Sequence, residues 1–201
     1  GHYEYITSTD TGFGKFIFVE KNNKNKNVLI GSKNTVRSYI VSDNAGTISV
    51  SGGTLLTTGT VSSIGGTDSG DIIAIGLTNK VEIYNKSLAL KQTIHVDNQT
   101  VALSSTGKYL FVGNPTATNS NGSFGQVYVY KNINNSFVLD QTIYNPATKA
   151  GMNFGISIDV TTDVNSLVVS ATGTNGTLDT TFDKNLMTFD GNITRIKGTE
   201  L

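Results

Sequence analysis

The sequence KSLALKQTIHV at residues 86–96 returns in altered form as NSFVLDQTIYN at residues 135–145. The two segments align an apolar pair, one charged residue and then Gln-Thr-Ile. Each is preceded at a similar distance by an alternating segment, KVEIYNK at 80–86 and QVYVYKN at 126–132. This agreement indicates an internal repeat built from β-strands.

Extending the alignment gives a unit of four strands, because each alternating segment follows an apolar strand and each apolar strand follows a short one. Four copies of the unit can be aligned, at residues 13–52, 61–96, 101–145 and 153–198. Their first strands begin near residues 13, 62, 101 and 154, and spacings of about 40–50 residues are typical of propeller blades. Residues 3–12 resemble the outer strand of a preceding or closing unit.

The composition favours the same fold class. The chain has 28 Thr, 18 Ser and 21 Asn among 201 residues, beside 22 Gly and two Pro. Thr is common in strands, whereas Asn, Ser and Gly make turns, and no window has sustained helical periodicity. We therefore expect an all-β fold, a β-propeller of about four four-stranded blades that is either closed or a segment of a larger ring. A β-sandwich is the alternative, because the spacing is irregular.

The charge and cysteine counts exclude several classes of function. Lys and Arg total 15 and Asp and Glu total 15, so no net charge favours nucleic acid. The chain has no cysteine, and hence no disulfide, Cys-ligated metal or thiol nucleophile. It has no run of about 18 apolar residues and no segment typical of a signal peptide, so membrane insertion is not predicted.

Two repeat copies resemble the FG-GAP (integrin-α-like) β-propeller repeats. The resemblance rests on FGISIDV at 154–160 with LVVSA at 167–171, and on YLFVGNP at 109–115 with GQVYVY at 125–130. It is good over residues 100–172, moderate over 13–52 and poor after 175. The resemblance implies a propeller whose usual role is binding.

Several blades of that family bind calcium in the loop between the first and second strands, through alternating Asp and Asn oxygens. The corresponding loops here are EKNNKNKN at 20–27, GGTDSGD at 65–71, STGK at 105–108 and TTDVN at 161–165. None has three alternating carboxylates, so Asp68 and Asp71, like Asp163 and Asn165, are interpreted as turn residues. We expect no cofactor and no metal.

Catalytic motifs are scarce. The sequence has no G-x-S-x-G, H-E-x-x-H or P-loop pattern. His95 aligns with Tyr144 in the next repeat, which indicates one face of a strand rather than a ligand or a base. The pairs Asp140 with Asp159 and Asp179 with Asp183 are the candidates for a glycosidase, but solvated turn carboxylates are the simpler interpretation. We therefore expect no enzyme activity and no catalytic residue.

Long loops on a regular scaffold are the usual place for binding. The stretches TATNSNGSFG at 116–125 and TGTNGTLDTTFDKN at 172–185 are the longest candidates. They supply the predicted ligand-binding residues, which are Asn119, Asn121, Phe124, Asn175, Asp179 and Asp183.

The sequence thus predicts a non-catalytic scaffold or binding module of a larger extracellular or virion-surface protein. Its expected partner is a protein or a glycan on the loop face, and it would act as a homo-oligomer or within a longer parent chain. The virion hypothesis follows from the Thr, Ser and Asn content, which is similar to that of phage tail and fibre proteins. A carbohydrate-binding lectin and a propeller glycosidase are the alternatives.

Overall fold

The computed structural model describes residues 5–21, 25–118, 124–145, 153–161, 166–171, 185–189 and 193–194, with the backbone alone for residues 124, 166, 185–189 and 193–194. The described residues contain sixteen strands and no helix, so the all-β prediction is confirmed. No helix in this part of the chain is long and apolar enough to cross a membrane.

The strands form four antiparallel sheets of four, each in simple chain order. The first sheet is β1 (Phe16–Val19), β2 (Asn25–Gly31), β3 (Thr35–Asn44) and β4 (Thr47–Thr58); the second is β5 (Val61–Gly66), β6 (Ile72–Leu77), β7 (Lys80–Asn85) and β8 (Leu90–Ile94). The third is β9 (Thr100–Leu103), β10 (Tyr109–Thr118), β11 (Phe124–Ile133) and β12 (Ser136–Tyr144); the fourth is β13 (Ser157–Val160), β14 (Ser166–Ser170), β15 (Asn185–Phe189) and β16 (Ile193–Thr194). A β-sandwich would place these strands in two sheets rather than four.

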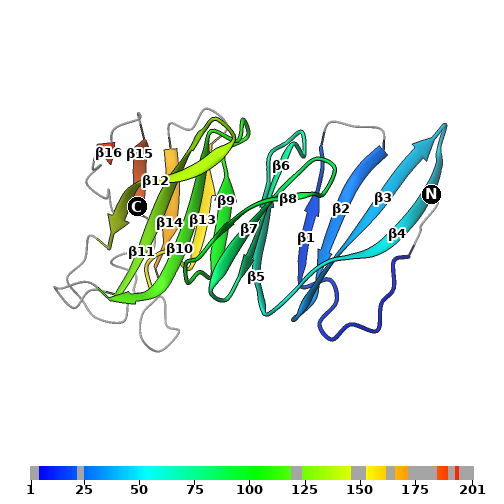
Figure 1. The fold of residues 1–201 in the computed structure, drawn as a ribbon, viewed down its shortest axis with the longest axis horizontal. Coiled ribbons are helices and arrows are strands. Elements are labelled where there is room, and N and C mark those ends of the chain that lie inside the picture. The colour runs from blue at the N-terminus through cyan, green and yellow to red at the C-terminus, as the bar shows by residue number, and fades with distance from the viewer. Residues whose placement is uncertain are drawn as a thin grey trace.

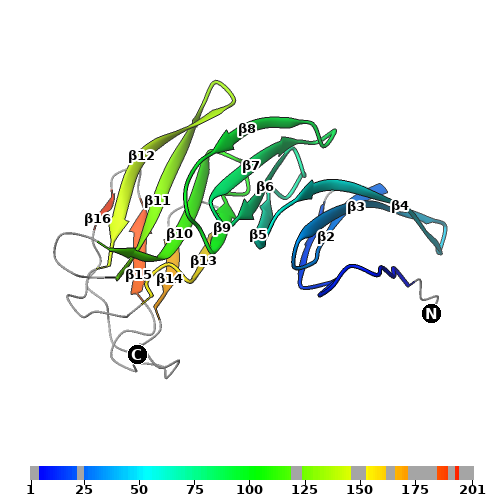
Figure 2. The same cartoon turned by 60° about the horizontal axis from the view of Figure 1, so that its bottom comes forward.

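The first three sheets follow one another in chain order along the long axis of the molecule, and the strands of the fourth overlap those of the third in this view (Figure 1). From the second viewpoint they lie along a curved path (Figure 2). The first strands are the points of closest approach, because β1 contacts β5, β5 contacts β9, and β9 contacts β13. The first sheet extends to Thr58, beyond the predicted end at residue 52.

An apolar cluster fills each junction between neighbouring sheets. In β6, Ile73 and Ile75 pack in the cluster shared with the first sheet, whereas Ala74 packs in the cluster shared with the third. Because successive side chains of a strand point to opposite faces, a strand between two sheets must be apolar throughout. This explains the continuous apolar run of DIIAIGL.

The pairing register aligns corresponding residues of the first three sheets. Tyr39, Tyr84 and Tyr130 lie on the third strands and pair with Val28, Ile73 and Leu110 on the second strands. All three tyrosines are buried on the side of their sheet that faces the preceding part of the chain. Pairing register therefore defines equivalent positions in the sheets.

Phe154 and Gly155 carry the chain from the third sheet into the fourth. Phe154 is fully buried in the cluster between these sheets and bridges Gly125 in parallel. Gly155 has a φ of +94°, a conformation that favours glycine. Its carbonyl approaches Gly113 so closely that a Cβ at residue 113 would overlap it.

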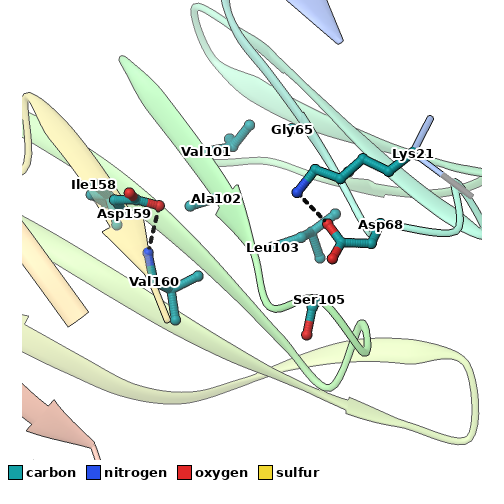
Figure 3. A pocket seen from close by; sticks show the side chains of 11 residues that line it. Lys21, Gly65, Asp68, Val101, Ala102, Leu103, Ser105, Ile158, Asp159 and Val160 are labelled. Carbon is teal, nitrogen blue, oxygen red and sulfur yellow. Dashed lines mark hydrogen bonds and ion pairs between the residues drawn. The ribbon is translucent and has the colours of Figure 1, made fainter. Parts of the chain in front are cut away.

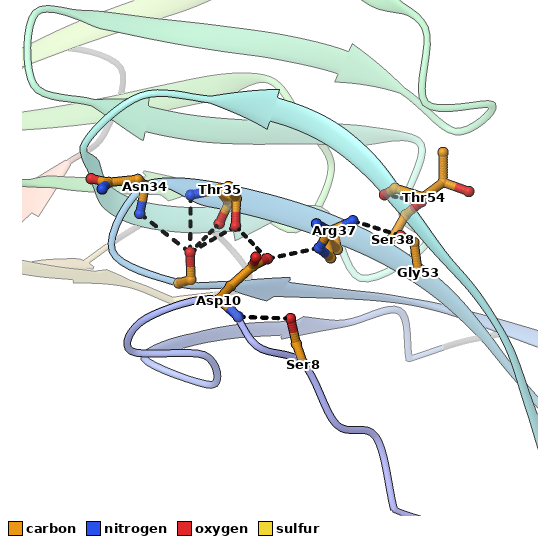
Figure 4. Close-up of polar contacts among 9 residues, drawn as sticks. Ser8, Asp10, Asn34, Thr35, Arg37, Ser38, Gly53 and Thr54 are labelled. Carbon is orange, nitrogen blue, oxygen red and sulfur yellow. Dashed lines mark hydrogen bonds and ion pairs between the residues drawn. The ribbon is translucent and has the colours of Figure 1, made fainter.

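Residues 5–12 form no strand, in contrast to the outer strand predicted at 3–12. Arg37 Nε and Thr35 Oγ1 instead donate hydrogen bonds to Asp10 Oδ2, over 2.7 and 2.8 Å (Figure 4). The side chains of Ile6 and Phe13 pack on the first sheet, on the face turned away from the second sheet. The segment is thus attached by side chains and by one backbone bond, from the Lys33 N–H to the Thr11 carbonyl over 3.0 Å, rather than by a ladder of such bonds.

Candidate ligand-binding site at the first strands

A pocket of about 290 Å³ lies where the first strands of the second, third and fourth sheets converge (Figure 3). Its walls are Gly65 and Gly66 of β5, Val101 to Leu103 of β9, and Ile158 to Val160 of β13. Three loop residues complete the lining. They are Lys21 in the loop after β1, Asp68 in the loop after β5 and Ser105 in the loop after β9. Four repeats therefore contribute to one site.

The glycines of β5 allow neighbouring strands to approach closely at this point. A Cβ on Gly65 would lie 3.2 Å from the carbonyl oxygen of Val101, and one on Gly66 would meet the ring of Phe18. At the equivalent positions of β9 lie Ala102 and Leu103, since Gly65 pairs with Ala74 and Ala102 pairs with Phe111. Small residues on β5 are what bring the first and third sheets close to the pocket.

An ion pair forms one side of the pocket. Lys21 Nζ lies 2.7 Å from Asp68 Oδ1, and the backbone N–H of Lys21 donates to the carbonyl of Asp68 over 3.0 Å. These two contacts join the loop after β1 to the loop after β5. Both side chains are partly exposed, so a ligand can reach the ammonium and the carboxylate.

Asp159 supplies a second carboxylate from the opposite side of the pocket (Figure 3). Its Oδ1 accepts the backbone N–H of Val160 over 2.9 Å, and the residue is exposed. The pocket thus offers one ammonium, two carboxylates and the Ser105 hydroxyl. This set of donors and acceptors suits a small ligand with several polar groups.

Of the predicted loop residues, the structure describes Phe124 alone, and it does not line this pocket. Phe124 begins β11, where its backbone pairs with Thr118. The other predicted binding residues, and the pair Asp179 with Asp183, lie outside the described residues; they are Asn119, Asn121, Asn175, Asp179 and Asp183.

The loops between first and second strands, where the resemblance places calcium, show no metal site in the part of the chain that the structure describes. Its residues include no group of three or more His, Cys, Asp or Glu side chains arranged for a metal ion. Asp68 pairs with Lys21, and Asp71 accepts a hydrogen bond from Ser69 that lowers the pKa of its carboxyl group. Asp163 and Asn165 lie outside the described residues.

The residues considered for catalysis are dispersed. His95 and Tyr144 are both exposed, just after β8 and at the end of β12. Asp140 lies on β12, the outer strand of the third sheet, whereas Asp159 lies on β13, the first strand of the fourth. The structure does not bring this pair of carboxylates together at one site.

Sequence reasoning missed Lys21 and Ser105 as site residues. The available signal was their position, because both lie in the loops between first and second strands that the repeat alignment had singled out for calcium. Convergence of these loops could not be read from the sequence, since it depends on how the sheets pack.

No family model matches the sequence, and no curated protein is similar enough to match it. Among solved structures, Kuenenia stuttgartiensis hydrazine synthase is similar, with 13% identity, a TM-score of 0.54, and coverage of 87% of this chain and 47% of that one. A provisionally named 6-phosphogluconolactonase from Bacteroides uniformis is similar at 12% identity and a TM-score of 0.59, over 86% of this chain and 49% of that one. At such identities the similarity concerns the fold alone, and the chain spans about half the length of each structure.

Proposed function

We propose that the four sheets are consecutive blades of a β-propeller and that the chain is a non-catalytic binding module of a larger protein. The simple strand order within each sheet, the contacts between successive first strands and the curved arrangement in Figure 2 support this proposal. The similarity to about half of each of two longer structures also supports it.

The proposed site is the pocket at the first strands, and the proposed ligand is a small saccharide. The observation that carries the proposal is the convergence of polar groups from separate repeats, Lys21, Asp68 and Asp159, around a cavity of about 290 Å³. Carboxylates accept hydrogen bonds from sugar hydroxyls, and an ammonium donates to sugar oxygens. A saccharide at this place would match the proposed role at an extracellular or virion surface, in adhesion or assembly.

The test is an NMR titration of the ¹⁵N-labelled chain with a panel of neutral monosaccharides. Amide shifts at Lys21, Asp68, Ser105 and Asp159 are expected for at least one sugar, and Asp68→Asn should weaken that binding. Asp140→Asn is the matched control, because Asp140 is an exposed carboxylate on β12, outside the pocket. Shifts confined to other residues, or equal affinity in the two variants, would contradict the proposal.

A glycosidase is the second candidate, because Asp68 and Asp159 face the same pocket from different sheets. Glycosidases use two carboxylates on either side of the scissile bond. Hydrolysis of nitrophenyl glycosides that is lost in Asp159→Asn would favour this candidate over a binding module. Binding of sugars without hydrolysis would favour the binding module.

A further inference from the structure

A second and larger cleft, of about 690 Å³, lies between the outer strands of the first and second sheets. One wall comes from β3 and β4 and the other from β7, β8 and the turn between them. The lining residues are Ser38, Thr54, Leu55, Leu56, Thr57, Glu82, Tyr84, Ser87, Leu88 and Leu90.

Comparison with the next junction explains why this cleft exists. Leu88 aligns with Phe137 in the repeated segments, and Glu82 is equivalent to Tyr128, because Glu82 pairs with Ile75 and Tyr128 pairs with Val112. Phe137 is 4% exposed and fills the junction between the second and third sheets, with Tyr128 packed beside it. Two aromatic rings at that junction are therefore replaced here by a leucine and a carboxylate.

The carboxylate of Glu82 is buried beside the cleft, with 5% of the residue exposed. Lys80 Nζ lies 2.7 Å from Oε1, and the Tyr84 hydroxyl donates to Oε2 over 2.7 Å. Burial favours the protonated acid, but hydrogen bonds from Lys80, Tyr84 and Thr57 outweigh it and lower the pKa of Glu82. Because Lys80 neutralises the charge of the Glu82 carboxylate, a ligand in the cleft need not carry a charge.

The remaining surface of the cleft is divided between hydroxyls and leucines. Ser38, Thr54, Thr57 and Ser87 place hydroxyl groups along it. Leu56 and Leu88 are partly buried in the cluster between the sheets, whereas Leu55 and Leu90 are 47% and 51% exposed. Exposed leucines beside a cavity of this size are typical of a small-molecule site, in which apolar walls bind and a few polar groups orient the ligand.

We propose that this cleft binds an uncharged amphiphile of the size of an alkyl glycoside. Its hydroxyl groups bond to the Thr57 hydroxyl and to the Glu82 carboxylate, which can accept further hydrogen bonds. Its apolar part lies on Leu55, Leu56, Leu88 and Leu90. This site is separate from the pocket at the first strands, so the two proposals can fail independently.

The probe is n-hexyl β-D-glucoside, titrated by NMR against the ¹⁵N-labelled chain. A Kd on the order of 1 mM is expected, with amide shifts at Thr57, Glu82 and Leu88. Hexanol and methyl β-D-glucoside, which carry the two halves of the probe, should each bind at least about tenfold more weakly, because neither contacts both surfaces. Equal binding of hexanol and the glucoside, or shifts confined to the first-strand pocket, would overturn the proposal.

Two variants locate the site. Leu88→Phe introduces the residue found at the next junction and should abolish binding by filling the cleft, although Leu88 has a φ of +61° that strains any side chain. Leu90→Ser changes an exposed position and should weaken binding about three- to tenfold without unfolding the chain.

Leu139→Ser is the matched control for Leu90→Ser. Leu139 aligns with Leu90, lies on β12 and is 50% exposed, but it does not line the cleft. Unchanged affinity in this control is expected. Equal weakening in Leu90→Ser and Leu139→Ser, or full affinity in a folded Leu88→Phe, would overturn the proposal.

Discussion

Asn98 connects the loop after β8 to the second sheet through three of its four side-chain hydrogen bonds; the fourth stays within the loop. Its Nδ2 donates to the carbonyls of Leu77, Lys80 and Val96, over 2.6 to 3.2 Å, and its Oδ1 accepts from Ser62 Oγ over 2.6 Å. The residue is 5% exposed. A buried amide with partners on both of its polar atoms stabilises the fold, because its removal leaves largely buried groups without their hydrogen bonds.

Asn98→Ala is therefore expected to lower the free energy of unfolding by about 2–3 kcal/mol. Asn44→Ala, at an exposed residue near the end of β3, is the control and should change it by less than about 0.5 kcal/mol. Urea unfolding followed by circular dichroism measures both values. Equal losses in the two variants would argue against the hydrogen-bonding role of Asn98.

Asp10 attaches residues 5–12 to the first sheet in a pH-dependent way. The hydrogen bond from Arg37 is the main cause that holds the pKa of Asp10 below its ordinary value of 3.8, followed by the bond from Thr35. Because the folded-state pKa is lowered, the ionised carboxylate stabilises the attachment fully above that ordinary value. The stabilisation is lost as the pH falls through the lowered pKa.

Acidification below about pH 3.8 should thus release this segment before the sheets unfold. Hydrogen exchange at the N–H of Phe13 and Lys33, which bond to the carbonyls of Asp10 and Thr11, measures the release. In Asp10→Asn the protection factors of these amides, which correct for the intrinsic pH dependence of exchange, should be lower at neutral pH and should not fall further in acid. Identical pH profiles for this variant and the unmodified chain would exclude Asp10 as the titrating group.

At the scale of elements, Gln92 on β8 bonds to the backbone of the next sheet. Its Nε2 donates to the carbonyl of Phe137 over 2.9 Å, and its Oε1 accepts the N–H of Phe137 over 2.8 Å. Gln141 on β12 is the aligned residue, yet its Nε2 is buried and has no hydrogen-bond partner among the residues that the structure describes. The same residue in the repeat therefore has two different energetic roles.

Gln92→Ala should lower the free energy of unfolding by about 1–2 kcal/mol, since two backbone groups lose their partner. Gln141→Ala should have a smaller effect, because removing an unpaired buried donor relieves a desolvation cost. Thermal and urea unfolding of this matched pair gives the comparison. A larger loss for Gln141→Ala would show that its amide is paired in solution.

At the scale of the whole molecule, the face of the fourth sheet that is turned away from the third sheet differs, in its described residues, from the equivalent faces of the second and third sheets. Gly65 and Ala102 face a following sheet, whereas the equivalent Asp159 is exposed and pairs with Val168, which is 40% exposed. Gly76 and Gly113 allow the following part of the chain to approach the second and third sheets closely, whereas Ser170 lies at the equivalent position of the fourth sheet. Any further sheet packed on this side would have to supply a hydrogen-bond or charge partner for the Asp159 carboxylate, because burying that group unpaired is costly.

The chain is accordingly expected to be a monomer of 21.4 kDa in solution rather than a stack in which the fourth sheet of one copy covers the first sheet of another. Replacing both Ser157 and Asp159 by leucine should promote association, because it creates an apolar sheet face. Light scattering after size-exclusion chromatography measures the mass. A dimer of the unmodified chain that Asp159→Lys abolishes would contradict this prediction.

The strands themselves could be predicted from the sequence, because strand pairing and burial impose a local pattern of apolar and polar residues. A strand between two sheets is apolar throughout, as in DIIAIGL, and its neighbour alternates, as in KVEIYNK, so the repeat and the all-β class are visible in the printed residues. The irregular segment at residues 5–12 was not predictable, because its conformation depends on Asp10 meeting Arg37 27 positions away.

Only the tertiary structure placed the two concave sites. Lys21, Asp68 and Asp159 are distant in sequence and meet because successive first strands pack together. The larger cleft depends on Leu88 lying where the next repeat has Phe137. The sequence shows this difference, but it does not show that a cleft results from it. The physical reason is that hydrogen-bond periodicity acts between neighbours along a strand, whereas cavities depend on side-chain volumes summed across sheets.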